Sequence, residues 1–179
     1  MTEHLPAPDA IALETLGLDS FETGLLAVLR HLLTAYARPE SQAWQTAFEL
    51  AAQRWGLARG PQVAMGLLPV LRALRGARRA DFEFANPLCL TCRHYATETE
   101  AAFLRMVQAM RHDRPDLARP AVLALAEGRM DPVLIQAGLA FAARFPAEPG
   151  TRPPLPSDQD QLDAGSDMRP GRRHLRLVH

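Results

Sequence analysis

Two cysteines, Cys89 and Cys92, form the pattern in this chain whose residue types and spacing are most typical of chemistry. A Cys-x-x-Cys pair lets two sulfur atoms converge on one ion within a tight turn, which is why structural zinc sites use it. The pair follows Asn86 and Pro87, a dipeptide typical of a turn. We therefore predict that this loop holds zinc or a similar metal.

A structural zinc ion takes four ligands, so the cysteine pair needs two more. We predict His94, two residues beyond Cys92, and His112, at the end of the following helix, as the other metal ligands. Asp81 and Glu83 offer oxygen atoms as alternative ligands. A homodimer in which two cysteine pairs share one ion would also complete the site. The spacing leaves these completions open.

Two other interpretations of the cysteine pair stay open. Free thiols pack well as small hydrophobic side chains and then have no chemical role. A redox pair is favoured by Arg93 and His94, because positive charge stabilises a neighbouring thiolate. Against this, the chain lacks the βαβ pattern that surrounds such a pair in thioredoxin-like proteins. Arg93 also stands where covalent haem attachment requires histidine.

No other pattern in the chain is typical of an enzyme. None of the four serines lies in a Gly-x-Ser-x-Gly elbow, and no phosphate loop, dinucleotide fingerprint or His-Glu-x-x-His motif occurs. Carboxylates such as Glu98 and Glu100 are explained by helix capping and solvation. We therefore predict a protein without enzymatic activity.

Arginine supplies all 20 basic residues, and 20 acidic residues balance them. A net charge of zero argues against a dedicated nucleic-acid-binding protein. Two arginine clusters suit phosphate or an acidic partner, although a solvated surface explains them more simply. The first cluster ends the third predicted helix and the second lies near the C-terminus: Arg72, Arg75, Arg78 and Arg79, then Arg172, Arg173 and Arg176.

Apolar residues that recur with the helical period predict five or six helices. The predicted helices lie at about 20–38, 44–55, 60–76, 97–112, 117–127 and 131–145. Ser20 is the expected N-cap of the first, and Thr97 with Glu100 matches a capping box at the fourth. Gly56 is placed to end the second helix, and Pro69 predicts a kink in the third.

These elements predict an all-α fold, a compact bundle of five to six helices with short connections. The Cys-x-x-Cys loop, residues 80–96, lies between the third and fourth helices and includes a short extended piece at 81–84. Another short helix is expected from Ala10 to Leu18. We expect Trp44, Phe48, Trp55 and the leucines of the first helix to supply most of the core.

The chain is predicted to divide into one helical domain, residues 1–145, and a disordered tail, residues 146–179. The tail is rich in proline at first, then acidic and finally basic, a composition typical of disorder.

The first ten residues do not resemble a secretory signal, and no apolar run reaches the roughly 18 residues of a membrane span. We therefore predict a cytoplasmic protein with no membrane association.

The leading functional hypothesis is a non-enzymatic adaptor or regulatory protein that binds a protein partner through a helical face. In this hypothesis zinc or packed thiols hold the cysteine loop in place. A thiol-based redox sensor that uses the same cysteines is the first alternative. A weakly nucleic-acid-associated factor that uses the arginine clusters is the second.

Overall fold

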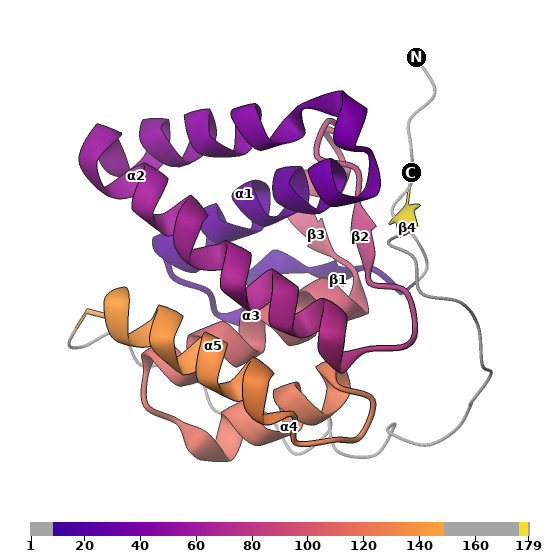
Figure 1. Ribbon diagram of the computed structural model, residues 1–179, viewed down its shortest axis with the longest axis vertical. Coiled ribbons are helices and arrows are strands. Elements are labelled where there is room, and N and C mark those ends of the chain that lie inside the picture. Colours follow the sequence, from indigo (N-terminus) through magenta and orange to yellow (C-terminus); the bar gives the residue numbers. More distant parts are fainter. Residues whose placement is uncertain (1–8, 149–175, 179) are drawn as a thin grey trace.

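Five α-helices form the body of the protein in a computed structural model that describes residues 9–148 and 176–178 (Figure 1). The helices are α1 (Ser20–Ala37), α2 (Ala43–Ala77), α3 (Glu98–Arg111), α4 (Pro115–Leu125) and α5 (Pro132–Arg144). Helix α1 packs against α2, α3 packs against α4, and α5 contacts both α2 and α3. The predicted all-α bundle is confirmed, and the cysteine loop lies between α2 and α3.

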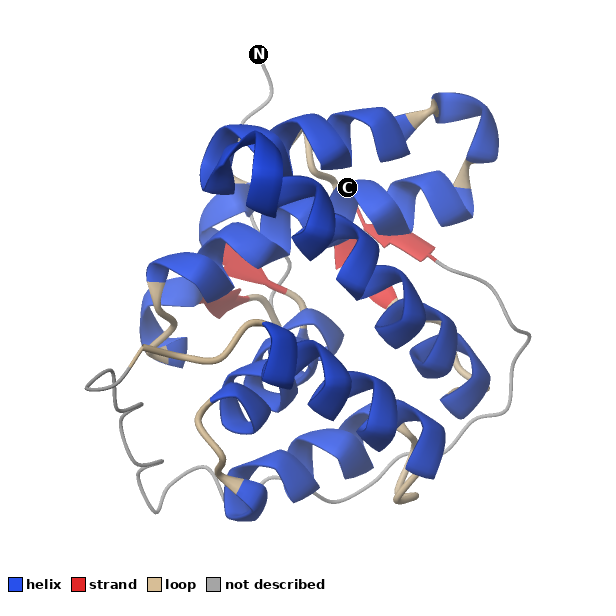
Figure 2. Ribbon diagram, turned by 60° about the vertical axis from the view of Figure 1, so that its left-hand side comes forward, coloured by secondary structure: helices blue, strands red, loops and turns tan. Residues whose placement is uncertain are grey.

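Four short strands add two small paired segments to the helical body (Figure 2). Strand β1 (Ile11–Ala12) pairs antiparallel with β3 (Tyr95–Ala96), and β2 (Glu83–Ala85) pairs parallel with β4 (Arg176–Val178). Three 3₁₀-helices complete the described elements: η1 (Leu13–Leu16), η2 (Pro39–Ser41) and η3 (Cys92–His94). The short extended piece expected before the cysteines is therefore present as β2. The helix expected from Ala10 is replaced by β1 and η1.

Capping boxes begin both helices that later prove to position the candidate site. In α3 the amide of Glu100 donates to Thr97 Oγ1 at 3.1 Å, and the amide of Thr97 donates to Glu100 Oε2 at 2.9 Å, as predicted. In α1 the N-cap is Asp19, whose carboxylate accepts the amide of Glu22 at 2.7 Å. The prediction that Ser20 caps α1 is wrong by one residue, because Ser20 is already helical.

Helix α2 is broken at Gly56, where the backbone has φ +80° and ψ 162°. Glycine adopts this left-handed φ without the steric cost that a Cβ would add, so the predicted end at Gly56 is confirmed. The chain resumes its helix at Leu57 and not at Gly60, because the intervening residues are good helix formers. At Pro69, where a kink is predicted, the backbone keeps helical dihedrals and α2 continues.

Aliphatic side chains fill the centre of the bundle. Leu25 and Leu29 of α1 are completely buried, as are Phe84 of β2 and Phe103 of α3. Burying a leucine or phenylalanine side chain contributes about 1.5–3 kcal/mol relative to leaving it exposed. The described core therefore depends mainly on α1, the second half of α2 and α3.

The expectation that the leucines of the first helix belong to the core is confirmed, but the expectation that Trp44, Phe48 and Trp55 join them there is wrong. Trp44 is 51% exposed, while Phe48 and Trp55 pack only against the edge of the core. The first half of α2 instead turns Ala47 and Ala51 inward, and both are completely buried. Small side chains let this helix approach its neighbours closely, which leaves the large aromatic rings at the periphery.

The predicted tail lies largely outside the described residues, at 149–175 and 179. For residues 176–178 the prediction of disorder is wrong, because they form β4 and pair with β2 in parallel register, Glu83 opposite Arg176. An unpaired strand edge presents free backbone donors and acceptors, and β4 satisfies those of β2.

Gly60 marks the closest approach between the two halves of α2. A Cβ at Gly60 would collide with the carbonyl group of Ala51 and with the Cα of Ala52, and backbone atoms cannot move aside cheaply. We predict that Gly60→Ala lowers the free energy of unfolding by about 1–3 kcal/mol. Urea denaturation followed by circular dichroism measures this loss.

Gly76→Ala provides the matched control, because a Cβ there meets no atom within 4 Å. This substitution is expected to raise the free energy of unfolding by about 0.5–1 kcal/mol, since alanine restricts the unfolded chain. Equal stability of the two variants would contradict the close approach at Gly60.

Candidate functional site

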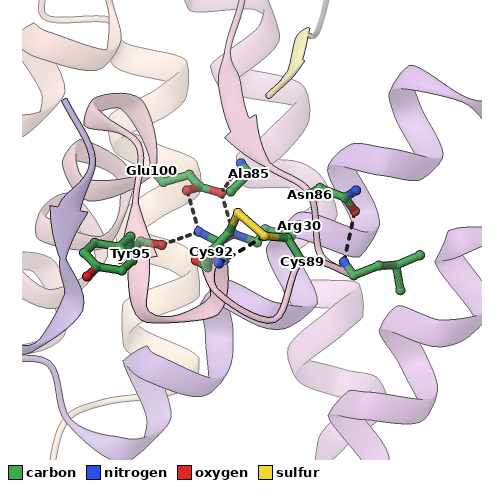
Figure 3. Close-up of a disulfide and its surroundings, with 8 residues drawn as sticks. Arg30, Ala85, Asn86, Cys89, Cys92, Tyr95 and Glu100 are labelled. Carbon is green, nitrogen blue, oxygen red and sulfur yellow. Dashed lines mark hydrogen bonds and ion pairs between the residues drawn. A yellow bond between two sulfur atoms is a disulfide. The ribbon is translucent and has the colours of Figure 1, made fainter. Parts of the chain in front are cut away.

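A disulfide joins Cys89 to Cys92 in a surface turn between β2 and η3 (Figure 3). The Cα atoms of the two cysteines lie 5.2 Å apart. The turn begins at Asn86, whose carbonyl oxygen accepts the amide of Cys89 at 3.1 Å and whose Oδ1 accepts the amide of Leu88 at 3.0 Å. The predicted turn at Asn86 therefore brings the two sulfur atoms together.

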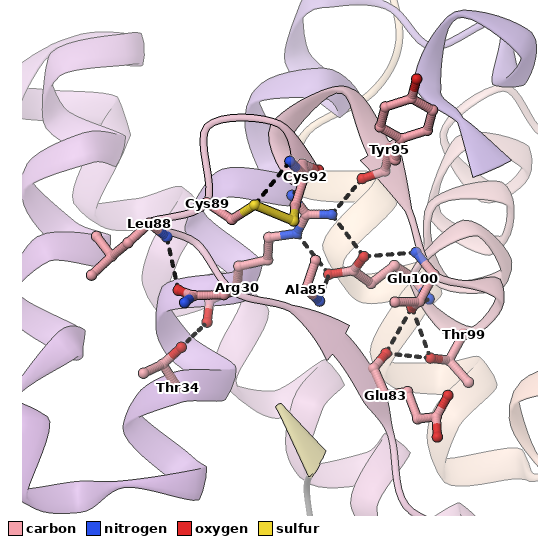
Figure 4. Close-up of polar contacts among 12 residues, drawn as sticks. Arg30, Thr34, Glu83, Ala85, Leu88, Cys89, Cys92, Tyr95, Thr99 and Glu100 are labelled. Atoms are coloured by element: carbon pink, nitrogen blue, oxygen red, sulfur yellow. Dashed lines mark hydrogen bonds and ion pairs between the residues drawn. A yellow bond between two sulfur atoms is a disulfide. The ribbon is translucent and has the colours of Figure 1, made fainter. Parts of the chain in front are cut away.

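Arg30 of α1 holds the inner side of this turn (Figure 4). Its Nη1 donates to the carbonyl oxygen of Cys92 at 3.1 Å, and its Nη2 donates to that of Tyr95 at 2.6 Å. The same guanidinium makes a two-pronged ion pair with Glu100, through Nε to Oε1 at 2.7 Å and Nη2 to Oε2 at 2.8 Å. Bidentate pairs of this kind fix geometry as well as charge.

Glu100 is completely buried and connects three elements. Besides Arg30, its carboxylate accepts the amide of Ala85 in β2 at 3.2 Å and caps α3 through Thr97. The expectation that capping explains Glu100 is confirmed, but the expectation of solvation is wrong. Its spacing from Thr97 revealed the cap, whereas no local signal revealed Arg30, which lies 70 residues earlier.

The outer side of the turn faces solvent. Leu88 is 79% exposed and Leu90 is 75% exposed, on either side of Cys89. Cys89 is half-buried, whereas Cys92 is only 7% exposed, so the sulfur of Cys89 is the more accessible one. The amide of Cys92 donates to Cys89 Sγ at 3.2 Å, a contact that favours negative charge on that sulfur.

The structure does not bring the four predicted metal ligands together. His94 is exposed, and its Nε2 accepts a hydrogen bond from Arg93 Nε at 3.1 Å. His112 follows the last residue of α3, about 20 Å along the helix axis from the capped end beside the cysteines. Its Nε2 lies 3.9 Å from Glu22 Oε1 instead.

His112 belongs to a second polar cluster with Asp19 and Glu22, whose potential ligand atoms lie within 4.8 Å of one another. It is the one group of three or more such residues found in the described ranges. Arg111 Nη1 already bridges Asp19 Oδ2, at 2.9 Å, and Glu22 Oε1. Gln108 Nε2 donates to Glu22 Oε2 at 3.2 Å. The guanidinium thus supplies the positive charge that a metal ion would bring.

Burial governs the titration of this cluster. Desolvation raises the pKa of Glu22 above its ordinary value, although the amide of Asp19 and the charge of Arg111 act in the opposite direction. Desolvation and the neighbouring Arg111 lower the pKa of His112. Burial also lowers the pKa of His31 in α1. Both histidines are therefore expected to be neutral at pH 7.

Comparison with known proteins found no matching family model, curated protein or solved structure. Within residues 9–148 and 176–178, no helix combines the length and the hydrophobicity that crossing a bilayer requires. Function is therefore inferred from the chemistry of the chain's own residues.

Replacement of Glu100 tests the anchor of the turn. Glu100→Gln leaves the guanidinium of Arg30 buried without its counter-charge, and we expect the free energy of unfolding to fall by about 3–5 kcal/mol. Chemical denaturation measures this loss, and the exposed Glu98→Gln serves as the control, with a change within about 0.5 kcal/mol. Two variants of equal stability would show that the buried pair is dispensable.

The lowered pKa values of His31 and His112 predict a loss of stability in acid. The unfolded chain binds protons near the ordinary histidine pKa, about 6.5, while the folded chain binds them only at lower pH. The stability that the two neutral histidines contribute is therefore fully present above about pH 6.5. It is lost as the pH falls through the lower pKa values that the histidines have in the folded chain.

The double variant His31→Gln/His112→Gln isolates the contribution of the two histidines. Its free energy of unfolding should change less between about pH 7.5 and about pH 5.5 than that of the unmodified protein. Glu22, whose pKa is raised, contributes with the opposite sign, and the single variant His31→Gln, which leaves the cluster of Glu22 and His112 intact, should show part of the same reduction. Identical pH dependence in both proteins would contradict the prediction.

Proposed function

We propose that the protein is a non-enzymatic thiol–disulfide regulator, in which the redox state of Cys89 and Cys92 controls contact with a protein partner. The observation that carries this proposal is a disulfide in a surface turn, with one accessible sulfur between two exposed leucines. We favour the redox hypothesis over the metal hypothesis, because the two sulfur atoms are bonded to each other.

A structural role accounts poorly for this disulfide. The sequence separation of the cysteines is 3 residues, so the bond closes a very short loop. The chain-entropy relation gives about 2 kcal/mol for such a loop, against about 4.7 kcal/mol for a 100-residue loop. The buried pair of Arg30 and Glu100 already fixes the inner side of the turn. The disulfide is therefore better suited to chemistry than to stability.

Thiol–disulfide exchange with a protein dithiol supplies the chemistry. A thiolate of the dithiol attacks Cys89 Sγ, a mixed disulfide forms, and the bond to Cys92 breaks with its sulfur leaving as a thiolate that takes a proton from water. The second thiol of the dithiol then attacks the dithiol sulfur of the mixed disulfide. This forms a disulfide within the dithiol and releases the thiolate of Cys89. Two electrons pass to the protein, and the reverse sequence oxidises it again.

The local charge favours such exchange. The segment from Asn86 to Tyr95 contains Arg93 but no acidic residue, and a neighbouring positive charge stabilises a thiolate. In a reducing compartment a disulfide of this kind is transient and has a sensing role. We therefore propose that the protein is located in the cytoplasm.

A protein partner fits the outer side of the turn. Leu88 and Leu90 project from a segment whose inner carbonyl groups are bound by Arg30, so the leucines are displayed on a rigid base. The disulfide spans the backbone on both sides of Leu90, and its reduction releases that constraint. A change of redox state thus alters the apolar contact surface while the helical core stays in place.

Trapping of the mixed disulfide tests the proposal. When the disulfide of the unmodified protein reacts with a thioredoxin variant whose second cysteine is replaced by serine, the mixed disulfide cannot be resolved and should accumulate, and peptide mass spectrometry should locate it on Cys89 and not on Cys92. Mass spectrometry of alkylated protein in thiol redox buffers should also give a reversible two-electron transition above about −300 mV. A disulfide that resists reduction until the chain unfolds would contradict the proposal.

The zinc hypothesis makes a different prediction for the same protein. Chain purified without chelators or a histidine tag would carry about one zinc per chain, or one per two chains for a shared site. Cys89→Ser would then release the metal and lower the melting temperature. That outcome would favour the metal site and would contradict the redox proposal.

A further inference from the structure

A pocket of about 510 Å³ lies at the C-terminal end of α2, away from the cysteine turn in sequence. Four of its lining residues are the arginines of the first cluster, Arg72, Arg75, Arg78 and Arg79. Arg72 and Arg75 lie in the last turns of α2 and Arg79 lies just beyond its end, and all of them line this one cavity. Small-molecule sites typically enclose about 300–1,000 Å³, so the pocket has a suitable size.

Three of these arginines, Arg72, Arg75 and Arg79, make no ion pair with another described residue. Arg72 and Arg79 are exposed, and the guanidinium of Arg75 lies 4.9 Å from the ring centre of Tyr36. The ion pairs among the described residues involve Arg30, Arg111 and Arg114, and none involves the pocket. The pocket therefore concentrates positive charge that the neighbouring side chains do not neutralise by direct contact.

Helix capping does not explain these arginines. Cations near a helix C-terminus are favourable because they compensate the last carbonyl groups. In α2 that role belongs to Arg129, whose Nη2 donates to the carbonyl oxygen of Ala77 at 2.6 Å. The nearby carboxylate of Glu127 is engaged by backbone amides, accepting those of Arg79 at 2.9 Å and Ala80 at 2.6 Å.

Arg78 is held more deeply than the other three. Its Nη1 donates to the carbonyl oxygen of Leu125 at 2.8 Å, and its Nη2 donates to that of Asp81 at 3.3 Å. Its Nε is the one buried side-chain nitrogen or oxygen in the described ranges without a hydrogen-bond partner. Burial lowers the pKa of Arg78, and the charges of Glu127 and Glu83 partly offset that effect.

The remaining wall of the pocket is apolar. Leu33 and Tyr36 of α1 line it together with Leu71 and Leu74 of α2 and Phe82 before β2. All of these except the half-buried Tyr36 are buried, so they support the pocket from behind and the ring of Tyr36 is the apolar group that a ligand can contact. A ligand for this pocket therefore needs an organic body as well as negative charge.

We propose that this pocket binds a small phosphomonoester, with its phosphate on Arg72, Arg75 and Arg79 and its organic part against the half-buried ring of Tyr36. A guanidinium matches two phosphate oxygens at once, and a phosphate dianion neutralises two of the three free charges. A carboxylate neutralises only one. Because the cavity is concave and the chain carries no net charge, a small ligand suits it better than a nucleic-acid backbone.

Calorimetric titration of the full chain with phenyl phosphate tests this site, in phosphate-free buffer at low ionic strength. We expect phenyl phosphate to bind about tenfold more tightly than benzoate, which carries one charge fewer. Inorganic phosphate should bind more weakly than phenyl phosphate if the apolar wall contributes. Absence of phenyl phosphate binding up to millimolar concentration would overturn the proposal.

Arg72→Gln/Arg75→Gln should weaken phenyl phosphate binding by about 100-fold, or about tenfold for each guanidinium removed. Arg105→Gln is the matched control for the single variant Arg72→Gln, because Arg105 is exposed on α3 outside the pocket and its loss removes the same single charge. Arg72→Gln alone repeats the test with an exposed residue if the double variant is unstable. Unchanged binding in both variants would place the ligand elsewhere and overturn the proposal.

Nuclear magnetic resonance locates the ligand without any variant. Signals of the Tyr36 ring and the Leu33 and Leu74 methyl groups should shift on addition of phenyl phosphate, while those of Leu88 and Leu90 should not. A single-stranded RNA oligonucleotide is added separately. If RNA shifts the pocket signals and phenyl phosphate does not, the arginines form a nucleic-acid surface and the small-ligand proposal is wrong.

Discussion

The buried ion pair between Arg30 and Glu100 is the contact on which the cysteine turn depends. A buried pair repays the cost of desolvation only when its remaining donors and acceptors are also satisfied. Here the missing partners are backbone groups of the turn itself: the carbonyl oxygens of Cys92 and Tyr95 for the guanidinium, and the amide of Ala85 for the carboxylate. The turn and the ion pair therefore stabilise each other, and neither is complete alone.

This arrangement gives the cysteine turn a rigid inner face and an outer face that is free to change. The inner face of the turn is bound by α1 and α3, whereas the exposed leucines and the accessible sulfur of Cys89 lie on its outer face. The arginine pocket is built in a similar way, since the exposed Arg79 lines it together with the buried Phe82, two residues before the completely buried Phe84 of β2. Both candidate sites thus rest on buried structure while presenting reactive or charged groups outward.

The sequence predicted what short-range physics determines, and it missed what only distant contacts create. Apolar periodicity located the helices, and the spacing of Thr97 and Glu100 revealed a cap, because both signals lie within one or two helical turns. Nothing local indicates that Arg30 lies against Glu100 or that Arg176–Val178 pairs with β2. The error over Trp44 has the same origin: hydrophobicity shows that a helix has an apolar face, but not that alanines will make the closest contact.

The two polar clusters also specify how α1 and α3 lie relative to each other. Helix α1 carries Glu22 near its start and Arg30 about two turns later, whereas α3 carries Glu100 at its start and Arg111 at its end. In the observed arrangement Glu22 meets Arg111 and Arg30 meets Glu100. Reversing one helix would place carboxylate against carboxylate and guanidinium against guanidinium in a buried layer, at a cost of several kcal/mol. Hydrophobic side chains alone would tolerate either relative direction of α1 and α3. The order of charges along the two helices therefore selects the direction that brings β2 and the cysteine turn to Arg30.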